Sequence, residues 1–147
     1  PWLSVFDVCY GYLAVGEKLL TSENYTYKEN FNLSPSEKNY SNVYNLSKLF
    51  LSTFGKIELK INEETVIGKE ARILHLDSSK ANSQLNWFAL YNFEKTIKET
   101  ANWYKLFLTG HKPLEISIEQ LEKYLALLNL NNNIKNSLIK QKNSIKK

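Results

Sequence analysis

Residues 69–110 constrain the fold more than any other stretch, because two apolar patterns of different period meet there across a polar turn. Apolar and polar residues alternate at residues 73–76, which predicts a half-buried strand. Further on, apolar side chains recur at helical spacing as far as Gly110, which predicts a helix over residues 93–108. The stretch therefore predicts a strand and helices that pack on one core.

The polar turn between these two patterns has helix signals at both ends. Asp77 stands where a carboxylate accepts from the first free amides of a short helix over residues 78–85. That helix has to stop and reverse before Trp87, and Asn86 is the residue suited to this. After Gly, Asn tolerates a left-handed backbone best, so we expect Asn86 at positive φ.

The rest of the chain predicts three further helices and one further strand. Apolar residues recur at three- and four-residue spacing in residues 4–20, 41–54 and 117–128. Ser41 is the expected N-cap of the second of these helices and Gly55 its end, while Ser117 and Gln120 make a capping-box sequence for the third. Strict alternation predicts a strand over residues 57–61. The predicted fold class is mixed α/β and dominated by helices.

The first of these helices contains two glycines and the only cysteine. Gly11 and Gly16 each lower helix propensity by about 1 kcal/mol relative to Ala, so we expect another element to approach closely there. Cys9 lies on the apolar face of the same helix, and we expect it to be buried and inert. A single cysteine forms no internal disulfide and fits a reducing compartment.

Composition limits the size and surroundings of the protein. The 147 residues are 43% hydrophobic, which is enough for one modest core. The chain contains no methionine, even at position 1, so we expect a fragment or a product trimmed at its N-terminus. It begins without a signal-peptide pattern, and no apolar run approaches the ~20 residues of a membrane span. We therefore expect a cytoplasmic protein with no membrane partner.

The net charge of +4 raises the question of nucleic-acid binding. Much of the basic excess is lysine in residues 129–147, for which we expect a frayed helix or disorder. The only arginine is Arg72. Because nucleic-acid surfaces favour the planar guanidinium fork, we do not expect a nucleic-acid partner.

Several segments together resemble a known enzyme family. In the central stretch these are Glu70-Ala71, Leu74, Leu76-Asp77-x-Ser79-Lys80-Ala81, Leu85-x-Trp87 and Thr100-x-x-Trp103-Tyr104. Nearer the N-terminus they are Pro1-Trp2, Gly11-Tyr12-Leu13, Glu17-Lys18-Leu19 and Phe31-Asn32-Leu33-Ser34-Pro35, the last expected as a short strand that runs into a turn. This pattern resembles extended short-chain dehydrogenases/reductases that act on nucleotide sugars, and within them the CDP-glucose 4,6-dehydratase family. The family usually has Leu-Gly-Trp where this chain has Leu85-Asn86-Trp87.

The resemblance implies a part of an enzyme rather than a whole one. Residues 1–128 would be its C-terminal nucleotide-sugar-binding region, and the parent would be an oligomer that acts in deoxysugar and lipopolysaccharide biosynthesis. The parent would oxidise C4 of the sugar, eliminate water across C5–C6 and return the hydride to C6. NAD would be bound by an N-terminal Rossmann half, since the chain contains no Gly-x-x-Gly-x-x-Gly cluster. We expect the family's Tyr-x-x-x-Lys catalytic pair in that half too, so this chain alone should be inactive.

Substrate contacts are the chemistry that remains for this chain. By the resemblance, Lys69, Arg72 and Trp2 would lie beside the nucleotide and its pyrophosphate, where a cation forms charge-assisted hydrogen bonds. The alternative roles are two surface charges and a tryptophan that packs under the first helix. No metal site is expected, because His75 and His111 lie far apart in the sequence without further ligands.

Two other functions stay open from the sequence. One is a part of another nucleotide-sugar epimerase or dehydratase of the same fold. The other, from a different class, is a non-enzymatic small helical binding module with a basic tail.

Overall fold

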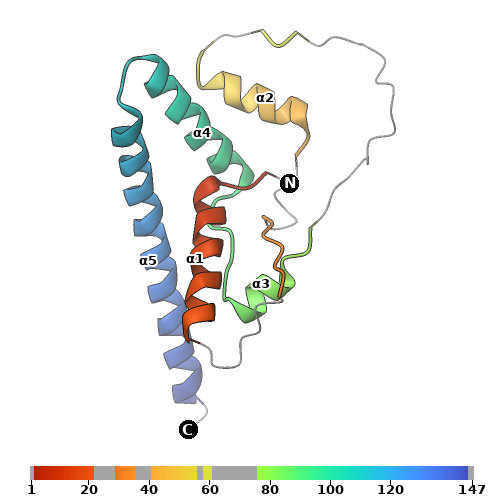
Figure 1. Cartoon of the computed structure of the whole chain (residues 1–147), viewed down its shortest axis with the longest axis vertical. Helices are drawn as coiled ribbons and strands as arrows, with labels where there is room; N and C mark the ends of the chain where they lie inside the picture. Colours follow the sequence, from red (N-terminus) through yellow and green to blue (C-terminus); the bar gives the residue numbers. More distant parts are fainter. Residues whose placement is uncertain (1, 22–28, 36–40, 56–57, 61–75, 146–147) are drawn as a thin grey trace, which may run out of the picture. The chain divides into compact units, whose positions relative to one another are not determined.

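The computed structural model describes residues 2–21, 29–35, 41–55, 58–60 and 76–145, with side chains as far as residue 132. This part of the chain contains five helices: α1 (Val5–Thr21), α2 (Val43–Ser52), α3 (Ser79–Gln84), α4 (Phe93–Leu108) and α5 (Pro113–Ile145) (Figure 1). The chain divides into two compact units, Pro1–Lys105 and Leu106–Lys147, which are described separately. None of the helices in the described ranges is long and apolar enough to cross a membrane.

The helix-dominated character is confirmed, but the described residues contain no strand. Residues 58–60 are exposed and lack regular structure, so the expected strand is wrong there, as is the one expected at residues 31–35. Residues 57 and 61 of the strand expected at 57–61, and residues 73–75 of the strand expected at 73–76, lie outside the described residues. Alternation in sequence gives a strand only when a neighbouring strand pairs with its backbone, and the described residues provide no such neighbour.

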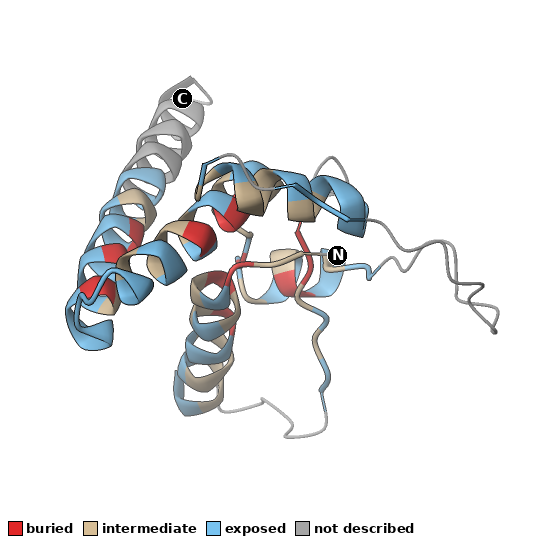
Figure 2. Ribbon diagram, turned by 90° about the horizontal axis from the view of Figure 1, so that it is seen from above, coloured by how far each residue is buried: buried red, intermediate tan, exposed pale blue. Residues whose placement is uncertain are grey.

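Helix α1 has the length that its periodicity predicts. However, its apolar face is exposed and the opposite face is buried. The residues that it buries are Asp7 and Gly11 rather than large apolar side chains. Tyr12 and Leu13 are instead exposed, and Figure 2 shows how little of this helix is buried. Cys9 is exposed as well, so the expectation that it is buried was wrong.

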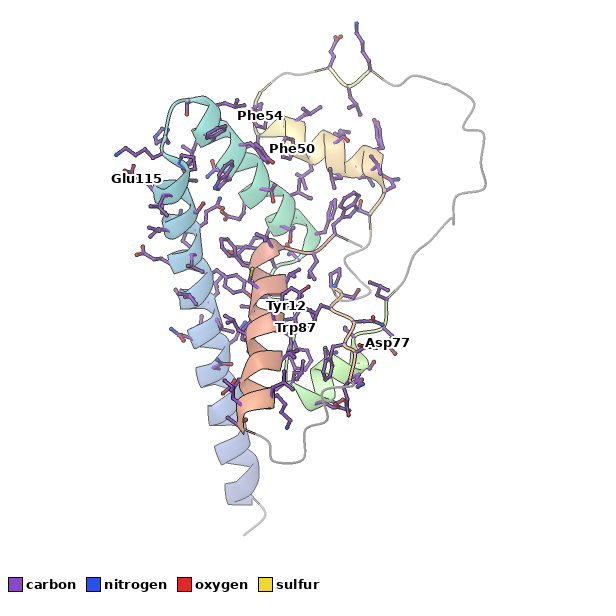
Figure 3. All side chains as sticks on the ribbon, in the orientation of Figure 1. Tyr12, Phe50, Phe54, Asp77, Trp87 and Glu115 are labelled. Carbon is purple, nitrogen blue, oxygen red and sulfur yellow. The ribbon has the colours of Figure 1, made fainter. Side chains whose placement is uncertain are left out.

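Helix α2 begins one residue later than expected from its N-cap. Asn42 is the N-cap, and its side-chain oxygen accepts from the Asn45 amide at 2.8 Å. An Asn at this position caps as well as the predicted Ser41 would. After the helix, Gly55 has φ of 105°, as its predicted role as the end of the helix requires. The ring centroids of Phe50 and Phe54 lie 5.5 Å apart (Figure 3).

Helix α4 coincides with the predicted range. It starts after Asn92, whose side-chain oxygen accepts from the Lys95 amide at 2.8 Å. Thr96, Ile97 and Ala101 are its buried residues. Gly110 follows the helix at φ of 93° and its amide donates to the carbonyl of Phe107, as expected for a terminating glycine.

In the second unit, α5 starts four residues before the predicted capping box. Pro113 begins the helix, because its fixed φ suits the first helical position and its missing amide leaves one fewer donor unpaired. The hydroxyl of Ser117 therefore lies within the helix and donates to the Pro113 carbonyl at 2.8 Å instead of capping the helix. The helix extends to Ile145, through most of the tail expected to fray. The division of this chain into a nucleotide-sugar-binding region, residues 1–128, and a tail, residues 129–147, stays a prediction.

Candidate functional site

The centre of the first unit is a buried carboxylate near the start of α1. Asp7 is 0% exposed. Its two carboxylate oxygens accept from the backbone amides of Leu90, at 2.8 Å, and Tyr91, at 3.3 Å. Burial of a charged group is costly unless hydrogen bonds compensate it, and these amides supply that compensation. The side chain therefore fixes the backbone of a segment more than eighty residues away in the sequence.

Trp87 makes a second connection between the same two segments. Its side chain is 0% exposed, and its indole N–H donates to the main-chain carbonyl of Asp7 at 3.0 Å. Figure 1 shows the chain after α3 running beside α1, and Figure 3 labels Trp87 there. We call these contacts of Asp7 with Trp87, Leu90 and Tyr91 the Asp7–Trp87 anchor. Sequence reasoning missed it, although an acid on the same helix face as Gly11 was a usable signal.

Because Gly11 has no side chain, Leu33 can pack against α1 beside this anchor. A Cβ atom at Gly11 would overlap the Leu33 side chain and lie 3.2 Å from Nε1 of Trp87. The expected close approach to the first helix is thus confirmed at Gly11. At Gly16 it is wrong, because a Cβ there would meet nothing within 4 Å. The difference between two glycines on one helix comes from tertiary packing and not from local sequence.

The turn that delivers Trp87 has the predicted left-handed residue. Asn86 has φ of 50°, the only positive value among non-glycine residues in the described part of the chain. The Trp87 amide then reaches back to the Ala81 carbonyl at 3.3 Å, which satisfies an acceptor at the end of α3. Asn in place of Gly therefore keeps the turn.

The start of α3 uses Asp77 as expected, with a shift of one residue. Ser78 occupies the N-cap position, yet Asp77 Oδ1 accepts from the Ser79 amide at 2.8 Å and from the Ser79 hydroxyl. The hydrogen bond from the hydroxyl and then that from the amide lower the pKa of Asp77 below its ordinary value of 3.8.

Lys80 ties α3 to the segment that precedes α2. Its ammonium lies 3.1 Å from a carboxylate oxygen of Glu29 and 4.9 Å from the centroid of the Phe31 ring. Both partners belong to residues 29–35, whose Ser34 is buried. The Lys80 ammonium thus interacts with Glu29 and Phe31 of the same chain, and we assign it no role in substrate binding.

The three predicted substrate-binding residues are only partly visible. Lys69 and Arg72 lie outside the described residues, as does His75. Trp2 is half-buried and donates its indole N–H to the Ser41 carbonyl at 3.0 Å. This bond joins the beginning of the chain to the segment just before α2.

Two tyrosine–lysine pairs in the chain do have the Tyr-x-x-x-Lys spacing, contrary to the expectation that this part lacks it. They are Tyr44 with Lys48 on α2, and Tyr91 with Lys95 at the start of α4. Burial raises the pKa of Tyr91, and the charges of Glu99 and Asp7 raise it further. A catalytic tyrosine needs the opposite shift to act as a base near neutral pH. The Lys95 ammonium moreover lies over the Tyr91 ring, 4.6 Å from its centroid.

No cluster of three or more His, Cys, Asp or Glu side chains suited to a metal ion occurs among the residues that the structure covers. The four glycines within this part lie inside α1 (Gly11 and Gly16) or follow α2 and α4 (Gly55 and Gly110). None of them forms a loop that could cradle a dinucleotide phosphate, so these residues do not fit NAD.

No family model matches the chain. A CDP-glucose 4,6-dehydratase of Salmonella typhimurium is 26% identical to it over 126 residues. The match covers 86% of this chain but 35% of the relative, so the chain spans about a third of the relative's length. The chain is thus distantly related to CDP-glucose 4,6-dehydratase.

Proposed function

We propose that this chain is the C-terminal, nucleotide-sugar-binding part of a 4,6-dehydratase that acts on CDP-glucose. One observation carries the proposal: segments that resemble the dehydratase family, far apart in sequence, contact one another. Gly11, Leu33 and Trp87 come from three such segments and meet at one point. This contact is what a shared fold would produce, and it adds to the 26% identity over 126 residues with the Salmonella dehydratase.

In the proposed enzyme this chain binds and orients the nucleotide sugar. Lys69 and Arg72 would hold the pyrophosphate, and Trp2 would lie beside the nucleotide. NAD, when bound by the remaining part of the enzyme, supplies the hydride acceptor and donor. We assign no proton- or hydride-transfer step to the residues of this chain. Burial and the charges of Glu99 and Asp7 raise the pKa of Tyr91, which is the opposite of what such a step requires.

The test uses a chimera in which this chain replaces the matched segment of the Salmonella relative. We expect the chimera to convert CDP-glucose and the isolated chain with added NAD to be inactive. Lys69→Ala in the chimera should weaken CDP-glucose binding by about ten- to a hundredfold, the range for loss of a charge-assisted hydrogen bond. The effect should shrink as salt rises. Lys60→Ala, at an exposed lysine nine residues earlier in the sequence, should stay within about twofold of the parent.

Other outcomes would point to the alternatives. A folded chimera that converts another nucleotide sugar but not CDP-glucose would indicate a related epimerase or dehydratase. A folded chimera without activity on any nucleotide sugar, or turnover by the isolated chain, would contradict the proposal.

A further inference from the structure

Helix α1 has an apolar face that the described part of its own unit does not bury. With about 100° of rotation per residue, five side chains fall within an arc of about 100°. We call them the outer stripe: Val5, Cys9, Tyr12, Leu13 and Leu20. The inner residues Asp7 and Gly11 lie on the opposite side.

The exposure of the outer stripe is large for apolar residues. Tyr12 is 71% exposed, Leu13 73% and Leu20 90%. Gly16 lies in the middle of the same arc, and a Cβ there would meet nothing within 4 Å among the described residues. A surface helix normally turns polar residues to water, and a contiguous apolar face marks an interaction site.

The length of the relative offers a partner for this stripe. The chain accounts for 35% of the relative's length, so a dehydratase of that length has a further part that must join this one. Contacts between domains of one enzyme bury roughly 600–1,500 Å². The stripe runs from residue 5 to residue 20, which is about 22 Å of helix and a suitable length for one side of such a contact.

We propose that the outer stripe of α1 is the docking surface for the remaining part of the dehydratase. The inference rests on the proposed function. Because the inner face of α1 carries the Asp7–Trp87 anchor, a partner on the outer stripe would be held in a fixed position relative to the segment that follows α3. Docking would thereby align the signature residues with the rest of the enzyme.

The experiment compares one substitution in two contexts, the isolated 147-residue chain and the chimera described above. Leu13→Lys should change the melting temperature of the isolated chain by less than about 2 °C, because the side chain is exposed there. In the chimera it should lower the melting temperature by more than about 5 °C, because the interface would bury a charge. Leu108→Lys is the matched control, since Leu108 is 71% exposed at the end of α4, and it should have little effect in either context.

Cys9 provides an independent measurement on the same stripe. Its alkylation by N-ethylmaleimide, followed by peptide mass spectrometry, should be at least about tenfold slower in the chimera than in the isolated chain. Equal alkylation rates, or equal effects of Leu13→Lys in the two contexts, would overturn the proposal. So would a dimer of the isolated chain that Leu13→Lys disperses, because the partner would then be a second copy.

If the chimera fails to fold, this chain can instead be co-expressed with the unmatched part of the relative. Co-purification that Leu13→Lys abolishes supports the docking surface, and absence of co-purification rejects it. Failure of the proposed function is distinguishable, because a chimera inactive on nucleotide sugars can still show the Leu13→Lys effect and the Cys9 protection.

Discussion

Helices α2 and α3 differ in a way that their sequences do not suggest. Helix α2 has ten residues and a clear apolar face, whereas α3 has six residues, none of them large and apolar. Yet α2 contains no buried residue, while α3 contains the fully buried Ala81 and leads directly to Trp87. Amphipathic periodicity identifies the face of a helix that can be covered. Whether it is covered depends on what the rest of the fold brings to it.

The hydrogen bonds of the two regions explain the difference. The turn after α3 is held to α1 by the Trp87 indole, over 80 residues, and by the Asp7 carboxylate, over 83 residues. At α2 the ring centroids of Phe50 and Tyr104 lie 6.1 Å apart, and hydrogen bonds from other segments reach its two ends, an exposed one from Lys105 to the Thr53 carbonyl and a part-buried one from Trp2 to the Ser41 carbonyl. We therefore expect the stability of the first unit to depend on the anchor far more than on α2.

Trp87→Ala should cause the largest loss and so tests the comparison most directly. Removal of a fully buried tryptophan should lower the free energy of unfolding by about 3–5 kcal/mol, measured by urea titration with circular dichroism. Phe50→Ala, at a half-buried site on α2, should cost about 1 kcal/mol. Trp87→Phe keeps most of the ring but removes the indole hydrogen bond to the Asp7 carbonyl, at a cost of about 0.5–1.5 kcal/mol. Equal losses for Trp87→Ala and Phe50→Ala would remove the distinction between the two regions.

The two glycines of α1 sharpen the comparison with one substitution at two sites. Gly11→Ala should destabilise by about 1–3 kcal/mol, because its methyl group would overlap Leu33 and press on Trp87. Gly16→Ala meets open space and should stabilise by about 1 kcal/mol through helix propensity. Urea unfolding of the two variants should therefore shift in opposite directions. A stabilising Gly11→Ala would mean that the anchor is loosely packed.

Asn86 tests whether the backbone of the turn matters as well as its side-chain contacts. Asn86→Val should destabilise by about 1–2 kcal/mol, because a β-branched residue is poorly tolerated at φ of 50°. Asn86→Gly should be neutral or slightly stabilising. If the two variants melted at the same temperature, the left-handed turn would contribute nothing to the position of Trp87.

Asp77 should give the smallest effect, because it is exposed at the start of α3. Its pKa is lowered by Ser79, so its charge stabilises the fold above the unfolded pKa, and this contribution is lost as pH falls through the folded pKa. Asp77→Asn should lower the melting temperature slightly at pH 7, and the difference should disappear as pH falls below about 3.8. A difference that persisted unchanged at low pH would show that the charge is not its cause.

Local sequence was sufficient for several elements of this protein. The helical period located α1, α2 and α4 to within a few residues, and Gly55, Asn86 and Gly110 were correctly identified as ends of helices. These features depend on interactions within about one helical turn or on backbone preferences of single residues, which a sequence carries directly. The start of α5 was missed because two local signals competed, and the proline at residue 113 prevailed over the capping box.

Only the tertiary structure decided which of these residues form the centre of the first unit. The sequence marks Asp7 as one polar residue in an amphipathic helix and Cys9, Tyr12 and Leu13 as its apolar face. The fold instead buries Asp7, since backbone amides far along the chain satisfy its carboxylate, and it exposes the apolar side. Burial and pairing are properties of contacts between distant segments, so no period within one segment can specify them.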